Sequence, residues 1–305
     1  MSRSVKFDTV DVFTTRRFAG NPLAIVEDAD GLTTAEMQAL AREFKLSETI
    51  FVQTPDDAAH TAKVRIFFPT AEIPFAGHPT IGCAIHLAQK ANPGDGDFET
   101  LVTLEEVAGL VPVRVWRRNG ATSAQFTAPV IPFAGEGITP APSLAAAALG
   151  LAETDIGFDR HAVALWQGGP GFVYVPVTDM DALKSARPCE PAWSQMMELG
   201  RVDSAYLYTR DPAEGKNAFR ARMFSPTAGI PEDPATGSAS AILAGQLLAS
   251  NELREGLNSF SLRQGYEMGR PSDISLEVDV ASGKMTAVRI AGSSVKVSDG
   301  TITVA

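Results

Sequence analysis

Residues capable of acid/base chemistry occur in two loops that a repeat in the sequence marks. Residues 65–74, RIFFPTAEIP, and residues 222–231, RMFSPTAGIP, share seven of ten positions at an offset of 157. The first segment is followed by FAGHP, which contains His78, and the second by EDPATGS, which contains Asp233. An imidazole and a carboxylate at matching places indicate a site to which each copy contributes a group.

The same offset identifies a third candidate, Glu48. Residues 47–51, SETIF, align with residues 204–208, SAYLY, so that Glu48 in the first copy corresponds to Ala205 in the second. A carboxylate in only one of two matching segments is how a single acid or base arises in a duplicated scaffold. Exposed glutamates are common, so Glu48 could equally be a solvated charge at the edge of a strand.

Each polar loop leads into an Ala-rich apolar run, which predicts helices that begin near Pro79 and Ala235. The first turn of a helix presents unpaired N–H groups and partial positive charge, and such ends bind carboxylate or phosphate. Gly77 and Gly237 would let a ligand approach the backbone closely, and Ser238 could cap the helix or donate to the ligand. Ordinary capped helices in a duplicated fold are the alternative interpretation.

The composition limits the class of protein. The chain has 305 residues, 45% of them hydrophobic, and a net charge of −10, which argues against a nucleic-acid partner because binding one requires a basic face. We find neither a signal-peptide pattern nor an apolar run of the roughly 18 residues that a membrane span needs, so we expect a cytoplasmic protein. Cys83 and Cys189 lack the spacing of metal ligands, and the four histidines are scattered, so we expect no metal site.

The remaining patterns predict an α/β fold with antiparallel or mixed sheets around central helices. Alternating residues from Val5 to Phe13 predict a first strand, and Thr33 or Thr34 predicts the start of a helix. An Ala-rich segment over 143–156 predicts a further helix, capped by Ser143. A Pro- and Gly-rich stretch over 128–142 predicts the linker between the two copies.

Five motifs in order, NPLAIV, SETIFV, RIFFPTAEIPFAGHPTIG, RMFSPTAGIPEDPATGSA and QGYEMGRPS, resemble the PhzF family of phenazine-biosynthesis-like isomerases, within the diaminopimelate-epimerase-like fold. The resemblance covers essentially the whole chain. It implies two pseudo-symmetric domains, each a sheet wrapped around a central helix, with the active site in the cleft between them. The first domain would span 1–127, completed by a final strand at about 293–305, and the second would span 128–292.

The resemblance also implies a role for each candidate residue. It makes Glu48 the main acid/base, with His78 and Asp233 as its polar partners. It places Gly237 and Ser238 beside the substrate carboxylate, and Asn21 and Gly77 along the cleft. A glutamate that is partly removed from water can have its pKa raised toward neutrality, which suits proton removal and return at carbon without metal or cofactor. The resemblance further implies a homodimer, without nucleic acid or membrane as partner.

One departure separates this chain from other enzymes of the wider fold. Diaminopimelate epimerase and proline racemase use two cysteines at helix entries, whereas the corresponding segments here read FAGHP and EDPATGS. The sequence therefore favours a cofactor-independent isomerase that moves a proton on a small carboxylate-bearing substrate. An epimerase or racemase of an amino or hydroxy acid that lacks the two-thiol mechanism is one alternative. A non-catalytic protein that binds small acids is another.

Overall fold

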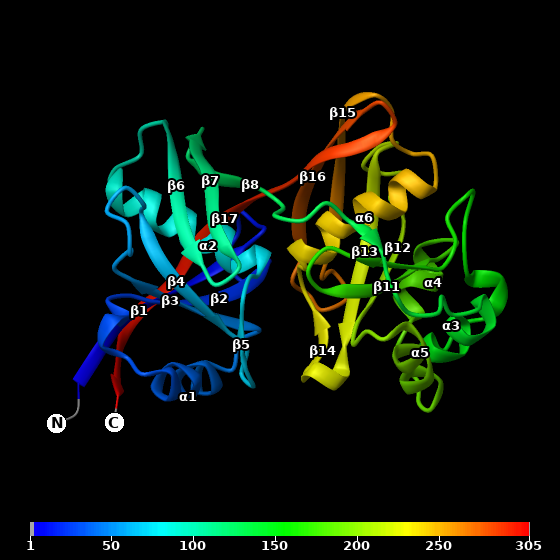
Figure 1. The fold of residues 1–305 in the computed structure, drawn as a ribbon, viewed down its shortest axis with the longest axis horizontal. Coiled ribbons are helices and arrows are strands. Elements are labelled where there is room, and N and C mark those ends of the chain that lie inside the picture. Colours follow the sequence, from blue (N-terminus) through cyan, green and yellow to red (C-terminus); the bar gives the residue numbers. More distant parts are fainter. Residues whose placement is uncertain (1–2, 305) are drawn as a thin grey trace. The chain divides into compact units, whose positions relative to one another are not determined.

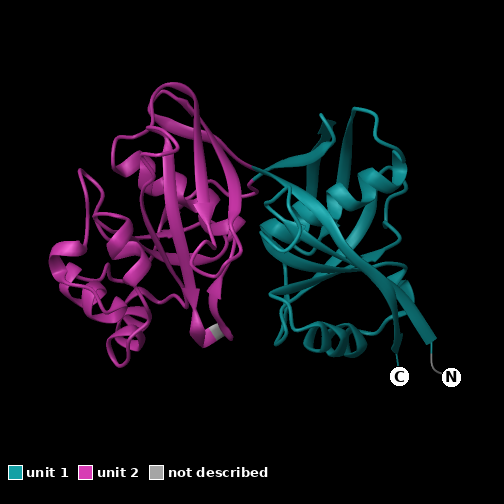
Figure 2. Ribbon diagram, turned by 180° about the vertical axis from the view of Figure 1, so that it is seen from behind, with its two compact units in different colours: residues 1–127, 291–305 teal, residues 128–290 magenta. Residues whose placement is uncertain are grey.

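The computed structural model describes residues 3–304, and the chain divides into two compact units. Unit 1 consists of Met1–Thr127 and Ala291–Ala305, drawn in teal in Figure 2, and unit 2 consists of Ala128–Ile290, drawn in magenta. Figure 1 labels the helices and strands of both units. The long final strand, β17 (Lys284–Val304), begins in unit 2 and ends in unit 1.

Unit 1 is built on a mixed sheet. Its other strands are β1 (Arg3–Val12), β2 (Asn21–Val26), β3 (Glu48–Gln53), β4 (Ala62–Phe67), β5 (Glu72–Ile73), β6 (Phe98–Glu106), β7 (Gly109–Arg118) and β8 (Ala121–Thr127). The pairs β1–β2, β3–β4, β4–β5, β6–β7 and β7–β8 are antiparallel, and β2–β3 and β4–β6 are parallel. β17 pairs antiparallel with β1, from Arg3 opposite Val304 onward, so the two ends of the described chain lie side by side.

Unit 2 repeats this order. Its strands are β9 (Phe133–Ala134), β10 (Ala164–Gln167), β11 (Gly171–Pro176), β12 (Ala205–Arg210), β13 (Ala218–Ser225), β14 (Ile230–Asp233), β15 (Gly256–Gln264) and β16 (Ser272–Ala281). The pairs β10–β11, β12–β13, β13–β14 and β15–β16 are antiparallel, and β11–β12 and β13–β15 are parallel. β12 thus takes the place in unit 2 that β3 takes in unit 1, and β15 takes the place of β6.

A buried helix lies at the centre of each unit. In unit 1, α2 (Gly77–Ala91) contacts β1, β2, β3, β6, β7 and β8, and in unit 2, α6 (Gly237–Ala249) contacts β10, β11 and β16. The packing is close enough to require glycine. A Cβ on Gly82 of α2 would lie 2.7 Å from a methyl carbon of Leu23, and one on Gly245 of α6 would lie 2.4 Å from the ring of Trp166.

Outer helices cover the remaining apolar surface. In unit 1, α1 (Thr34–Phe44) begins with the capping box of Thr33 and Glu36 and buries Met37, Leu40 and Ala41. In unit 2, α3 (Pro142–Leu149), α4 (Met180–Ser185) and α5 (Ala192–Gly200) enclose a core that includes the fully buried Trp193. Among the helices of residues 3–304, none combines the length and apolarity that crossing a membrane requires.

Two sequence-based expectations about helices were wrong in detail. The central helices begin at Gly77 and Gly237 instead of Pro79 and Ala235. Their offset is 160 because five residues separate Pro231 from Gly237, whereas only two separate Pro74 from Gly77. The predicted helix over 143–156 is also shorter. α3 begins at Pro142 without a cap from Ser143, and it ends at Leu149 because Gly150 takes the left-handed conformation, with φ of 65°.

Candidate active site

Glu48 is the first residue of β3, which runs parallel to β2 and pairs Glu48 with Leu23. Only 8% of its surface is exposed. The interpretation of Glu48 as a solvated charge at a strand edge is therefore wrong. A carboxylate that folding removes from water must be held by specific polar contacts, and these are the contacts from which chemistry can be built.

His78 supplies one of these contacts. It is the second residue of α2, and its Nε2 lies 3.4 Å from Oε2 of Glu48. On the other side of the ring, Nδ1 lies 3.3 Å from the amide nitrogen of Asn21, which is fully buried at the start of β2. The structure thus brings together three predicted residues that are 27 and 30 positions apart in the sequence.

His78 is neutral at ordinary pH. Burial lowers the pKa of its imidazole to about 3, although the ring also donates a hydrogen bond to the backbone carbonyl of Pro22, which opposes the shift. A neutral imidazole has one N–H donor and one acceptor nitrogen. It can therefore orient the Glu48 carboxylate or relay a proton, but it does not act as a fixed positive charge beside it.

The helix that carries His78 also provides backbone donors. Gly77 is buried and begins α2, and the residue before it, Ala76, makes no side-chain cap to this first turn. Thr80 uses its hydroxyl on the carbonyl of Ala76, at 2.7 Å, instead of capping the helix. An N-terminal turn without a side-chain cap keeps N–H groups and partial positive charge available for an anion.

In unit 2 the predicted residues lie on one loop and the helix end that it enters. Asp233 ends β14, is 5% exposed and accepts a hydrogen bond of 2.5 Å from the hydroxyl of Thr236. Gly237 begins α6, and Ser238 follows it, half-buried. Gln264 holds this loop. It is the first residue of the QGYEMGRPS motif, but the sequence predicted no role for it.

The two repeated arginines hold the loops that precede the central helices. Arg65 makes two hydrogen bonds to Glu72, at 2.7 and 2.6 Å, and Arg222 makes two to Glu232, at 2.8 and 2.9 Å. Arg222 also donates to the backbone carbonyls of Leu183, Lys184 and Ala186. At these positions the sequence repeat therefore encodes the same structural ion pair in both units.

Neither cysteine occupies a position from which a thiolate could act. Cys83 lies inside α2, fully buried, and burial raises the pKa of its thiol. Cys189 is half-buried, and its thiol donates to the carbonyl of Arg187. This placement agrees with the argument from the sequence against a two-thiol mechanism.

A second polar cluster in unit 1 has the residue types of a metal site. The ligand atoms of Asp8, Glu27 and His86 lie within 4.8 Å of one another, and His86 Nε2 is 2.6 Å from Glu27. Each carboxylate already binds a lysine, however. Lys90 lies 2.8 Å from Glu27, and Lys296 lies 2.6 Å from Asp8. The cluster is an ion-pair network, and we assign it no metal.

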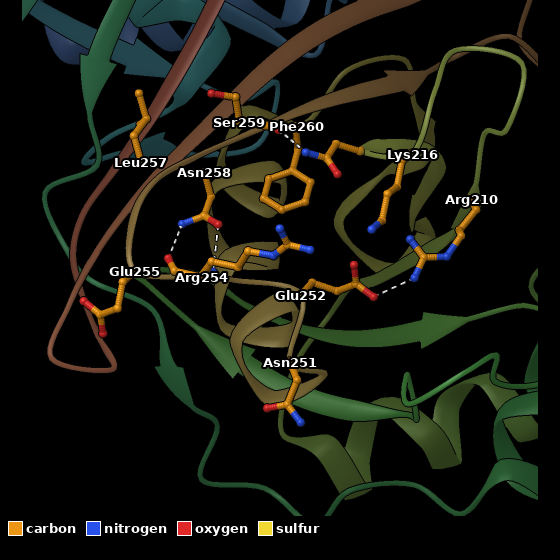
Figure 3. Close-up of a pocket in the computed structure, with 11 residues that line it drawn as sticks. Arg210, Lys216, Asn251, Glu252, Arg254, Glu255, Leu257, Asn258, Ser259 and Phe260 are labelled. Atoms are coloured by element: carbon orange, nitrogen blue, oxygen red, sulfur yellow. Dashed lines mark hydrogen bonds and ion pairs between the residues drawn. The ribbon is translucent and has the colours of Figure 1, made fainter.

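Unit 2 also contains a cavity of about 760 Å³ (Figure 3). Its lining includes none of the predicted site residues. Arg210 is neutralised there by Glu252, at 2.5 Å. Lys216 and Arg254 have no ion-pair partner among residues 3–304, but both are exposed, and solvated cations of this kind are common on protein surfaces. We assign this cavity no role.

Comparison with known proteins identifies relatives across the full chain. The sequence pattern of the family PhzC-PhzF, described as phenazine biosynthesis-like protein, matches residues 10–300. A protein of Mesorhizobium japonicum named as an uncharacterized isomerase is 45% identical over 294 residues, which cover 95% of this chain and 96% of that protein. The trans-2,3-dihydro-3-hydroxyanthranilate isomerase of Pseudomonas aeruginosa is 32% identical over 295 residues, covering 97% of this chain and 98% of that enzyme.

The fold is also found among solved structures. The crystal structure of a phenazine biosynthesis protein of the PhzF family from Bacillus anthracis superimposes with a TM-score of 0.85 at 26% identity. The match covers 98% of this chain and 99% of that one. The resemblance inferred from the five motifs is therefore confirmed, as is the mixed α/β architecture.

Proposed function

The chain belongs to the phenazine biosynthesis-like PhzC-PhzF family of isomerases, and on this premise we propose that it moves a proton between carbon positions of a small carboxylate-bearing substrate by general acid/base catalysis at Glu48. The observation that carries the proposal is the placement of Glu48. Its carboxylate is buried at the start of β3 and faces a neutral imidazole across 3.4 Å.

In the proposed reaction, the Glu48 carboxylate removes a proton from a substrate carbon, and the C–H electron pair enters the conjugated system of the substrate. The protonated Glu48 then returns the proton to a different carbon, so that no redox partner is needed. His78 and Asn21 keep the carboxylate oriented through both steps. A base that is also the returning acid needs a low barrier in each direction, and this is why a partly desolvated carboxyl group suits it.

The helix ends are proposed to bind the substrate carboxylate. Gly77 begins α2, and Gly237 and Ser238 begin α6, so each offers backbone N–H groups at a positive dipole end. Asp233 is proposed as the polar partner that unit 2 supplies. Fixed donors of this kind also stabilise the negative charge that develops as the proton leaves carbon.

The experiment is a substrate screen followed by isotope exchange. Binding is detected as a thermal shift, first with trans-2,3-dihydro-3-hydroxyanthranilate, the substrate in the name of the P. aeruginosa relative, and then with cyclic and linear amino and hydroxy acids. The ligands that bind are incubated with enzyme in D₂O. The proposal predicts a product isomerised at carbon, with deuterium at the carbon that receives the proton to the extent that the Glu48 proton exchanges with solvent before it is returned.

Two outcomes would change the proposal. Deuterium that replaces hydrogen at the same carbon, with inversion, would identify an epimerase that uses the same groups. Binding with neither an isomerised product nor deuterium at carbon would overturn proton transfer and favour a protein that only binds small acids.

A further inference from the structure

The two units carry different side chains at the ends of two equivalent strands. β6 ends at Glu106 and β15 ends at Gln264, 158 residues later. Both strands run parallel to the strand that precedes the central helix, β6 beside β4 and β15 beside β13. Glu106 and Gln264 therefore occupy the same place in the repeated architecture, and both are buried.

Gln264 uses both ends of its amide to hold the loop before α6. Its nitrogen donates to the carbonyl of Asp233 at 2.7 Å and to the hydroxyl of Thr236 at 3.0 Å. Its oxygen accepts from the backbone N–H of Thr236 at 3.2 Å. A neutral group that both donates and accepts is what this position needs, because the carbonyl of Asp233 requires a donor and the N–H of Thr236 requires an acceptor.

Glu106 contacts the first turn of α2 through one side chain, that of Thr80. Its Oε1 lies 2.7 Å from the hydroxyl oxygen of Thr80, and that oxygen also lies 2.7 Å from the carbonyl of Ala76. The Thr80 hydroxyl has one hydrogen, and the Ala76 carbonyl can only accept. Both short contacts are satisfied together when Thr80 donates to Ala76 and a protonated Glu106 donates to Thr80.

We propose that Glu106 works as a neutral carboxylic acid, the counterpart of the Gln264 amide, and that it positions the first turn of α2 from which His78 faces Glu48. A protonated carboxyl group and a primary amide have nearly the same shape, and each provides a donor and an acceptor. Glu106 acts through Thr80 and makes no contact with the reacting atoms, so it is a positioning residue. Its effect on turnover rests on the function proposed above, whereas its protonation does not.

The surroundings of Glu106 explain why it stays protonated. One titratable group near Glu106 is Cys83 on α2. The charged groups near it line with it a cavity of about 440 Å³, and they are Lys63 and Arg65 on β4, Glu105 on β6 and Asp56 before β4. Each of these charged groups is engaged elsewhere. Lys63 pairs with Asp56, Arg65 with Glu72 and Glu105 with His60. Burial therefore dominates and raises the pKa of Glu106 to about 8, although a hydrogen bond from the Thr80 hydroxyl to the ionised carboxylate would act in the opposite direction.

The direction of the pH effect follows from this shift. Folding raises the pKa of Glu106 from an ordinary value of 4.5 to about 8, so folded protein binds more protons than unfolded protein between these limits. The contribution to stability is complete below pH 4.5 and is lost as the pH rises through 8. Ionisation of Glu106 would remove its donor and place a negative charge beside the Ala76 and Thr80 oxygens, which loosens the turn that carries His78.

The first test replaces Glu106 by its neutral isostere. Glu106→Gln is expected to retain turnover within about threefold at pH 7, because an amide keeps the donor and acceptor. The turnover of wild type is expected to fall about tenfold between pH 7 and pH 9, since only about one molecule in ten keeps the Glu106 proton one pH unit above the pKa. The variant is expected to lose less than about twofold over that range. The same alkaline decline in both proteins would overturn the proposal.

The reciprocal change and a direct readout complete the test. Gln264→Glu should introduce a second ionisable group, and turnover should then fall at alkaline pH because of unit 2 as well, which does not happen in wild type. Infrared spectra of wild type should contain the carbonyl band of a protonated carboxylic acid at pH 7, which disappears with a midpoint near pH 8 and is missing from Glu106→Gln. Lack of that band in wild type overturns the proposal, even if the variant fails to fold. If wild type has this carbonyl band but no isomerase activity, the protonation of Glu106 stands and only the proposed function is refuted.

Discussion

The entries to β3 and α2 in unit 1 and to β12 and α6 in unit 2 hold the same places in the order of elements but carry different side chains. The first residue of β3 is Glu48, whereas the first residue of β12 is Ala205. The second residue of α2 is His78, whereas the second residue of α6 is Ser238. Both helix ends keep their backbone donors. Under the proposed function, the features shared by the two units hold the fold and bind the substrate carboxylate, while the unshared features supply the single base.

The strongest test of this division is Glu48→Gln. It leaves unit 1 with a side chain that cannot ionise at this position, as Ala205 does in unit 2. The change keeps the size of the side chain and removes the base, so turnover should fall by at least about 10²-fold, while substrate binding changes much less. Ser47→Ala is the matched control in the preceding residue and should cost far less. If Glu48→Gln still carries deuterium into the substrate at the wild-type rate, the base is another group, with His78 or Asp233 as the candidates.

A second test uses the different ionisation of the two helix entries. Folding holds the pKa of His78 at about 3, below its ordinary value of 6.5, so its contribution to stability is present above pH 6.5 and is lost as the pH falls toward 3. Between pH 6.5 and pH 4.5, wild type should lose about 2 to 3 kcal/mol more stability than His78→Asn in urea titrations.

Ser238→Ala, the counterpart in unit 2, should leave that acid dependence unchanged because serine does not titrate. In NMR spectra, the ring of His78 should show no titration between pH 5 and pH 8. A midpoint near 6.5 would mean that the imidazole is solvated and that its proposed role beside Glu48 is wrong.

A third test compares the repeated arginines, which the sequence cannot tell apart. The side chain of Arg222 is 9% exposed and that of Arg65 is 20% exposed. Arg222→Ala also leaves three carbonyls near α4 without their donor. We expect a loss of about 3 kcal/mol for Arg222→Ala and about 1 to 2 kcal/mol for Arg65→Ala, measured by urea unfolding. Equal losses would show that the additional contacts of Arg222 contribute nothing.

The smallest expected effects concern the caps of the outer helices. Thr33 accepts from the N–H of Glu36 at the start of α1, and Asp179 accepts from the N–H groups of Asp181 and Ala182 at the start of α4. Alanine at either position should cost about 1 kcal/mol of unfolding free energy. Thr33→Ser keeps the acceptor and should cost much less. A loss above about 2 kcal/mol would indicate a role beyond capping.

Much of the site could be predicted because its signals are local. The SETIF motif placed Glu48 at a junction between helix and strand, and α1 does end at Phe44 before β3 begins at Glu48. The Gly-bearing loops and apolar runs located both central helices within two residues. Burial of Glu48 could not be predicted, since alternation alone does not say which strand end is covered.

The parts that escaped prediction depend on tertiary contacts. Thr80 and Glu106 are 26 residues apart, and Thr236 and Gln264 are 28 apart, and each pair meets only because a strand returns beside the central helix. The three extra residues between Pro231 and Gly237 shifted the repeat from an offset of 157 to 160, which a fixed-offset alignment misses. The helix predicted over 143–156 is present but ends at Leu149, because Gly150 takes the left-handed conformation, which the Ala-rich composition did not indicate.

The path of β17 also constrains the order in which the protein is made. Unit 2 is one continuous segment, Ala128–Ile290, whereas unit 1 needs Ala291 onward to complete the sheet beside β1. During synthesis, β17 is made after every other strand and helix of both units, so pairing of Arg3 with Val304 closes a loop of about 300 residues. We therefore expect the second unit to fold first and the sheet of the first unit, which carries Glu48, to be completed only once β17 has been made. Until then, the chain would contain Glu48 without the finished sheet that orients it.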